Sequence, residues 1–191
     1  MKNKPIILVA GEPNSIFFEI FFKAIKKKRY KSPLVLICCK RLFFKQMKLF
    51  NFKKKLKVLN INKLKNMNID NKSINLIDIR LQKSSNIKNQ YKFSNIYINE
   101  MFNAAFQIIR KKITKKFING PINKKTFLNK KFLGVTEFIS KSFKKKKTGM
   151  LIYNKKLSVC PVTTHLPIKL VAKKITKKLI EEKIEMINVF F

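Results

Sequence analysis

The sequence is short of several residue types that usually carry function. Its 191 residues include four arginines, four glycines, three cysteines, two aspartates, one histidine and no tryptophan. No segment approaches the ~18 consecutive apolar residues that a membrane span requires, so we expect no transmembrane helix and no membrane partner. The phosphate-binding patterns GxGxxG and GxxxxGK[ST] are also absent, which excludes the best known nucleotide-binding loops.

The cysteines exclude two further classes of protein. Cys38 and Cys39 are adjacent and Cys160 is distant, a spacing that fits neither a disulfide framework nor a zinc motif.

The apolar run at residues 6–10 is too short for a signal peptide, and Glu12 and Pro13 stand where a cleavage site would be. These features predict a cytoplasmic protein.

Lysine is present in excess. The chain has 45 Lys and Arg against 9 Asp and Glu, a formal net charge of +36. Such an excess is typical of proteins that bind nucleic acids or anionic surfaces, yet 41 of the 45 cations are lysines rather than the arginines that grip phosphates in a planar fork. The abundance of Lys, Asn, Ile and Phe together indicates A/T-rich coding. A lysine-rich nucleic-acid or anionic-surface binding protein without catalysis is therefore our second hypothesis, and we do not expect nucleic acid as a partner.

Continuously apolar segments alternate with amphipathic ones along the chain. Periodicity predicts strands at residues 5–10, 33–39, 56–59, 74–79, 117–118, 149–153 and 157–162, and helices at 15–28, 40–50, 94–112, 125–129 and from 168 nearly to the end. Apolar strands that alternate with helices are typical of a mostly parallel sheet covered on both faces. The sequence thus predicts a three-layer α/β fold.

The single histidine, His165, is the clearest candidate for chemistry. It follows the strand predicted at 157–162, which would place it at the carboxyl end of a sheet strand, where α/β folds bind ligands. One histidine cannot hold a metal alone. The four glycines all lie in predicted turns, where a positive φ angle or a close approach of two backbones is the usual reason for glycine.

Five motifs, taken together, resemble one family. They are KPIILVAGEPNS at residues 4–15, NGPINKKTF at 119–127, GVTEF at 134–138, MLIY at 150–153 and VCPVTTHLPIK at 159–169. In this order they resemble the 4-hydroxythreonine-4-phosphate dehydrogenases of pyridoxal phosphate biosynthesis. The resemblance covers most of the chain, and GPINK and TTHLP are its most specific parts.

The resemblance implies a fold like that of isocitrate and isopropylmalate dehydrogenases, with the second half incomplete. Residues 1–115 would form the N-terminal α/β part, and residues 116–191 would begin the second part, which forms the dimer interface. The implied protein is a cytoplasmic homodimer that acts on a small phosphorylated substrate. Its reaction is the NAD-dependent oxidation and decarboxylation of 4-phosphooxy-L-threonine, assisted by a divalent metal (Zn, Mg or Co).

The resemblance also implies roles for three residues. His165 would be one of three metal-ligating histidines, and Thr136 would contact the substrate. Val135 stands where the family has a substrate-contacting histidine, and it can neither donate a hydrogen bond nor carry charge. No catalytic residue and no NAD contact can be assigned. The chain ends before the segments that supply the other metal histidines, so we expect a divergent, shortened member and leave open whether it catalyses.

Overall fold

The computed structural model describes residues 3–82, 87–128, 132, 134–145 and 147–191. The chain divides into two compact units, Met1–Phe127 and Leu128–Phe191, and each is described by itself. The family resemblance implied a boundary after residue 115, whereas the first compact unit extends to Phe127. The strand at residues 117–119 joins the sheet of the first unit, which accounts for the later division.

The first unit is built on a five-stranded parallel sheet. Its strands are β1 (Ile6–Val9), β2 (Leu34–Cys38), β3 (Leu56–Val58), β4 (Ile74–Asp78) and β5 (Phe117–Asn119). Their order in space is β3-β4-β2-β1-β5, and every pairing is parallel. Nearly all positions of β1, β2 and β4 are buried, as expected of strands covered on both faces. The predicted α/β fold is confirmed.

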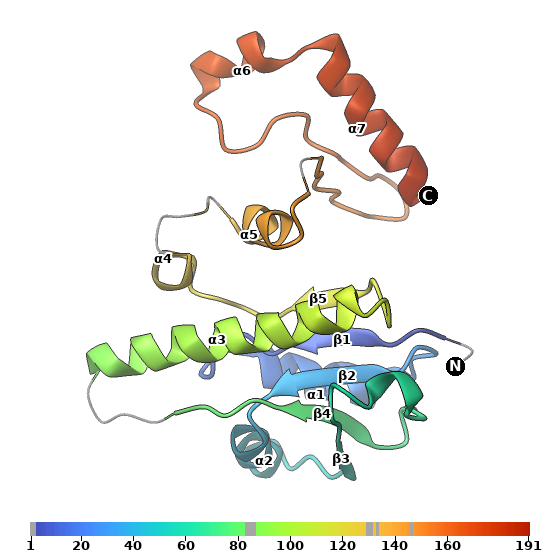
Figure 1. The fold of residues 1–191 in the computed structure, drawn as a ribbon, viewed down its shortest axis with the longest axis vertical. Helices are drawn as coiled ribbons and strands as arrows, with labels where there is room; N and C mark the ends of the chain where they lie inside the picture. The colour runs from blue at the N-terminus through green and yellow to red at the C-terminus, as the bar shows by residue number, and fades with distance from the viewer. Residues whose placement is uncertain (1–2, 83–86, 129–131, 133, 146) are drawn as a thin grey trace. The chain divides into compact units, whose positions relative to one another are not determined.

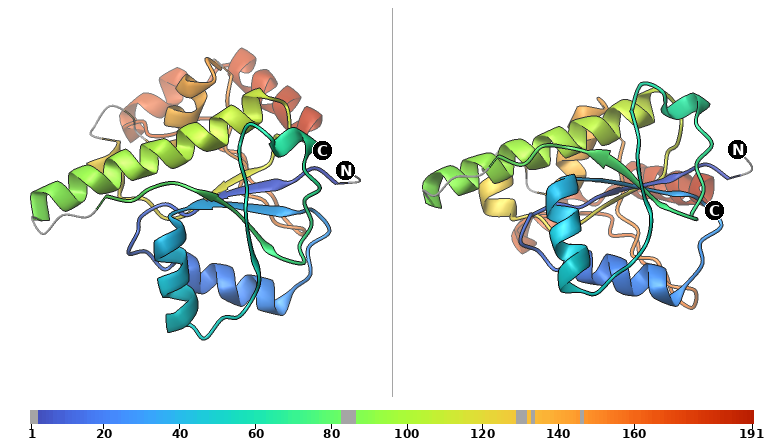
Figure 2. Two further views of the ribbon diagram at one scale, coloured as in Figure 1. Left: turned by 60° about the horizontal axis from the view of Figure 1, so that its bottom comes forward. Right: turned by 90° about the horizontal axis from the view of Figure 1, so that it is seen from below.

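Helices cover both faces of this sheet. They are α1 (Phe17–Lys27), α2 (Lys40–Leu49), α3 (Ile87–Arg110) and α4 (Lys124–Phe127), with a 3-10 turn, η1 (Leu64–Asn66). Figure 1 and Figure 2 show α3 on one face and α1 with α2 on the other. This arrangement gives the three layers that the sequence predicted, with the sheet in the middle.

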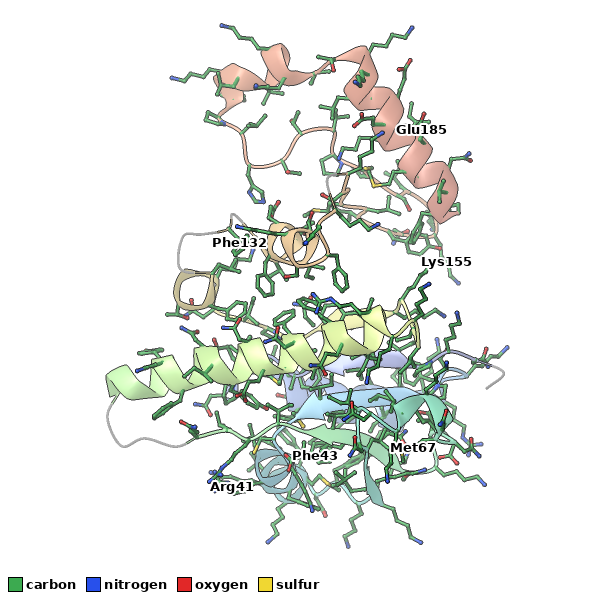
Figure 3. All side chains as sticks on the ribbon, viewed as in Figure 1. Arg41, Phe43, Met67, Phe132, Lys155 and Glu185 are labelled. Atoms are coloured by element: carbon green, nitrogen blue, oxygen red, sulfur yellow. The ribbon has the colours of Figure 1, made fainter. Side chains whose placement is uncertain are left out.

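Each face of the sheet has its own apolar core. Residues of α3 at intervals of three and four are fully buried, as the periodicity predicted: Ile98, Met101, Phe102, Ala105 and Ile108. The opposite core is aromatic, and Phe43 of α2, labelled in Figure 3, packs against Phe18, Phe21 and Phe22 of α1. The phenylalanines that alternate with lysines in α1 and α2 therefore include buried core residues.

The helix ends differ from the sequence prediction in two places. The first helix begins at Phe17 rather than at Ser15, because the Ser15 hydroxyl donates to the Glu12 carbonyl oxygen at 2.8 Å and closes a turn instead. The third helix begins at Ile87, seven residues before the predicted start at Ser94. Its first turns are polar, so the apolar periodicity used for the prediction marks only the packed part.

The second unit is helical in its described residues. It contains α5 (Val135–Ser142), α6 (Ile168–Lys174) and α7 (Lys177–Phe190). The single helix predicted after residue 167 is interrupted before Thr176, whose side chain accepts a hydrogen bond from the Leu179 N–H at 3.2 Å and caps α7. None of the helices in the described residues combines the length and apolar character needed to cross a bilayer.

The two strands predicted in the second unit are wrong. Among the described residues of this unit, only Ile152 and Val159 pair, as an isolated antiparallel bridge with two backbone hydrogen bonds of 2.8 and 2.9 Å. Their side chains are 60% and 49% exposed. Apolar residues gave these segments strand propensity, but they pack against no sheet in the described residues, and propensity alone does not form one.

Cys38 and Cys39 are buried in the first unit. Their burial predicts how reactive each thiol is. Burial, together with the nearby Cys39 and Asp78, raises the pKa of the Cys38 thiol, and thiols react as thiolates. We expect a thiol reagent to modify the half-buried Cys160 in the folded protein and Cys38 and Cys39 only after unfolding. Mass spectrometry after timed labelling measures this, and early modification of Cys38 would contradict it.

The same raised pKa sets a pH dependence. Cys38 stays protonated in the folded protein at a pH where an unfolded thiol ionises, so the unfolded state then binds fewer protons. Its contribution to stability is complete below the unfolded pKa of about 8.5 and is lost as pH rises toward the folded value. The free energy of unfolding is expected to fall above about pH 8.5, with a shallower slope in Cys38→Ala.

Candidate functional site

The first candidate site lies at the carboxyl edge of the parallel sheet, between β1 and β5. After β1 the chain continues through α1 to β2 on one side of β1, whereas β5 lies on the other side. The order of the strands therefore reverses at β1, and two loops leave the carboxyl ends of neighbouring strands there. Open α/β sheets bind ligands at such a point. The loops are residues 10–15 and 120–123.

Two glycines allow these loops to touch. Gly11 has a φ angle of +79°, and a Cβ there would lie 2.2 Å from the Pro121 carbonyl oxygen. A Cβ on Gly120 would lie 2.2 Å from the Ala10 carbonyl oxygen and 2.7 Å from the Phe17 ring. The sequence predicted that its few glycines serve a positive φ angle or a close approach, and these two provide both.

A carboxylate joins the loops to α3. Glu12 accepts a hydrogen bond from the Ser94 hydroxyl at 2.6 Å through Oε2, and one from the Asn123 N–H at 3.3 Å through Oε1. Its own N–H donates to the Pro121 carbonyl oxygen at 2.8 Å. Sequence reasoning missed Glu12 and Ser94, which are 82 residues apart. The signal that could have found Glu12 is an acid in a strand-to-helix turn of a chain with only nine acids.

The second candidate site lies in the second unit, at the beginning of α5. Gly134 is the residue before the helix, and Val135 and Thr136 form its first turn, both half-buried. Glu137 follows, and its Oε2 atom is buried without a hydrogen-bond partner. A Cβ on Gly134 would lie 2.9 Å from this oxygen and 3.9 Å from Nε2 of His165. The fold thus brings His165 to the GVTEF motif.

The position of His165 differs from the prediction. Residues 157–162 form no strand, so His165 does not stand at the carboxyl end of a sheet strand. It lies in an exposed loop with a φ angle of +57°. A non-glycine residue in this left-handed region is uncommon. The loop conformation, rather than a strand end, directs His165 toward Gly134 and Glu137.

The donor atoms near His165 are too few for a metal centre. Across the part of the chain that is described, no three His, Cys, Asp or Glu side chains form a group that could hold an ion. His165 offers one imidazole, and Glu137 offers a carboxylate beside the same glycine. A catalytic zinc site needs three protein ligands, so these residues alone do not fit one.

Comparison with known proteins decides the family. The family model described as pyridoxal phosphate biosynthetic protein PdxA matches residues 30–190. The chain belongs to the PdxA family. The match includes four of the five motifs on which the resemblance rested, among them GPINK, GVTEF and TTHLP, and leaves out only the motif at residues 4–15. It favours a dehydrogenase relationship over the lysine-rich binding protein that the charge alone suggested.

Named relatives of this PdxA-family chain agree. It is 32% identical to a 4-hydroxythreonine-4-phosphate dehydrogenase of Sulfurihydrogenibium sp. (strain YO3AOP1), over 96% of this chain and 56% of that protein. It is 30% identical to the protein of the same name from Wigglesworthia glossinidia brevipalpis, over 95% of this chain and 55% of that one. The chain spans about half the length of the relatives it matches.

A solved structure supports the fold of the PdxA-family chain. The crystal structure of 4-hydroxythreonine-4-phosphate dehydrogenase from Klebsiella pneumoniae matches with a TM-score of 0.76 at 18% sequence identity. The match covers 98% of this chain and 58% of that one. At this identity the likeness establishes the fold.

Proposed function

We propose that this chain is a divergent 4-hydroxythreonine-4-phosphate dehydrogenase-like protein and a subunit of a cytoplasmic homodimer. It binds 4-phosphooxy-L-threonine, the substrate that the family oxidises and decarboxylates with NAD. The observation that carries the proposal is the family match over residues 30–190. The names of its relatives support an oxidoreductase of pyridoxal phosphate biosynthesis. NAD, the metal and the dimer come from the family resemblance alone.

Thr136 is the residue of this chain that we assign to the substrate. It lies in the first turn of α5, half-buried beside Gly134, where the unpaired N–H groups of a helix end favour an anionic ligand. Its hydroxyl can donate to or accept from a phosphate or hydroxyl oxygen. Val135, at the position of the family histidine, adds only apolar surface.

His165 is the residue that we assign to the divalent metal, as one ligand among several. When bound in such enzymes, a divalent metal polarises the oxygen of the substrate and stabilises the charge that develops on it. This chain has one histidine in total, and its described residues do not complete a site. We therefore assign no step to the metal here, and we assign no residue to NAD.

Substrate binding without turnover is the expected result for the purified chain. We expect 4-phosphooxy-L-threonine to bind, and Thr136→Val to weaken binding about fivefold through the loss of one hydrogen bond. We expect Val135→His to strengthen binding, because it restores a donor next to Thr136. Isothermal titration calorimetry measures the three affinities, and NADH absorbance measures turnover, which should be absent.

The control is Thr148→Val, which removes a hydroxyl elsewhere in the second unit and should leave the affinity unchanged. Equal affinities of the wild type and Thr136→Val would reject the assigned substrate contact. Turnover by the purified chain would show that its own ligands suffice and would reject the expected inactivity. Gel filtration measures the homodimer independently of both results.

A further inference from the structure

A pocket at the amino edge of the sheet has no role in the proposed reaction. It has a volume of about 580 Å³ and lies where β2 and β4 begin, between Leu34, Ile74 and the end of α1. The β1 and β5 loops of the first candidate site lie at the opposite edge, where these strands end. The volume is within the range of small-molecule sites.

The rim of the pocket is positively charged. Five of its lining residues are cations, namely Lys26, Lys28, Arg29, Lys54 and Lys72, and none is an Asp or Glu. Among the described residues, none of these five forms an ion pair with a carboxylate. Lys54 is also half-buried. Cations that line a concave surface without a carboxylate partner favour a ligand with several negative charges.

The buried residues that line the pocket are apolar apart from Asn75. Phe21 and Leu36 are almost completely buried there. Asn75 is 1% exposed, and its Nδ2 donates to the carbonyl oxygens of Leu34 and Asp70 at 3.1 and 2.6 Å. Its Oδ1 is buried without a partner. A buried acceptor that lacks a donor is costly, so a ligand with an N–H or O–H group would complete it.

The wall that carries Arg29 and Tyr30 is held in place by Asn71. Its Nδ2 donates to the carbonyl oxygens of Tyr30 and Ser32, both at 2.9 Å, and its Oδ1 accepts from the Leu34 N–H at 2.9 Å. This side chain therefore fixes the loop between α1 and β2. A wall fixed before binding lowers the entropy that a ligand must overcome.

We propose that this pocket binds a nucleoside triphosphate. The phosphates contact the rim cations, and Arg29 is one of only four arginines in a chain that otherwise uses lysine, with the planar fork suited to phosphate. The base lies on the apolar floor, where an exocyclic amino group donates to Asn75 Oδ1. An anion without a base satisfies the rim but leaves the floor empty.

Calorimetric titration of the full chain with ATP, at physiological ionic strength, tests the proposal. We expect ATP to bind at least about tenfold more tightly than inorganic tripolyphosphate, because only ATP fills the floor. The triple variant Arg29→Gln, Lys54→Gln, Lys72→Gln should weaken ATP binding by about tenfold or more. Circular dichroism checks that each variant keeps its secondary structure.

A second triple variant with the same loss of charge is the control. Lys45→Gln, Lys48→Gln, Lys92→Gln changes exposed lysines outside the pocket, and it should change ATP affinity less than about threefold, the residual effect of long-range charge. Equal weakening by both triples, equal affinity for ATP and tripolyphosphate, or no ATP binding would each overturn the proposal. Thr136→Val should leave ATP affinity unchanged, so this test is independent of the proposed function.

Discussion

Gly120→Ala is expected to destabilise the first unit by about 3–5 kcal/mol. The added Cβ would lie 2.2 Å from the Ala10 carbonyl oxygen and 2.7 Å from the Phe17 ring, distances that no rotamer of alanine can relieve. Gly120 also donates its N–H to the Val9 carbonyl oxygen at 2.7 Å. Relief of the clash would therefore separate β5 from β1, which are neighbours in the sheet. Urea unfolding monitored by circular dichroism measures the loss.

Gly149→Ala is the matched control for this substitution. Its Cβ would meet only Sδ and Cε of Met186, at 2.9 and 3.0 Å, and the end of a methionine side chain can move aside. We expect a cost of about 1 kcal/mol or less. Similar losses for the two variants, or a Gly120→Ala protein as stable as the wild type, would show that the loops are not held together by this contact.

The first unit could be predicted closely from its sequence because its signals are local. Fully apolar runs such as residues 33–39 identify strands buried on both faces, and the spacing of Ile98, Met101 and Phe102 identifies the packed side of α3. Alternation of these elements then implies a parallel sheet, because parallel strands need a crossover between them. The order of the strands in space does not follow from such local signals.

Contacts between distant segments could not be predicted. Nothing near Glu12 in the sequence indicates that its carboxylate meets the Ser94 hydroxyl, 82 residues away. The approach of His165 to Gly134 likewise depends on a loop with a positive φ angle at a histidine, which residue type does not signal. At residues 149–162 the sequence has strand propensity, but no strand forms. A strand needs a neighbouring strand to accept its hydrogen bonds, and propensity does not indicate whether one is present.

The cations of the chain fall into two groups, the exposed lysines of the surface and the cations that line the amino-edge pocket. Most lysines are exposed, and the attraction of an exposed lysine for anions is weak and screened by salt. The cations around the amino-edge pocket differ because they line a concave surface together with Asn75, whose Oδ1 is buried without a partner. Net charge alone could not distinguish these two groups, since both consist mainly of lysine.

Phe43→Ala is expected to cost about 3–5 kcal/mol in the free energy of unfolding. Its ring is completely buried and lies 6.0, 6.3 and 5.6 Å from the ring centroids of Phe18, Phe21 and Phe22. These rings join α1 to α2 beneath the sheet. Removal of the ring loses its burial and leaves a cavity between rigid aromatic neighbours that cannot collapse into it.

The adjacent Phe44 provides the control for Phe43→Ala. It lies on the same helix but is 43% exposed, and the Lys40 ammonium lies over its ring, 5.9 Å from the ring centroid. We expect Phe44→Ala to cost about 1 kcal/mol or less, since an exposed cation–π contact contributes little. If base stacking rather than packing explained these phenylalanines, the exposed ring would matter for RNA binding and Phe43→Ala would leave stability unchanged. A large difference in stability between the two variants, with no change in RNA affinity for Phe44→Ala, therefore identifies the aromatic cluster as the core on the α1 and α2 face of the sheet.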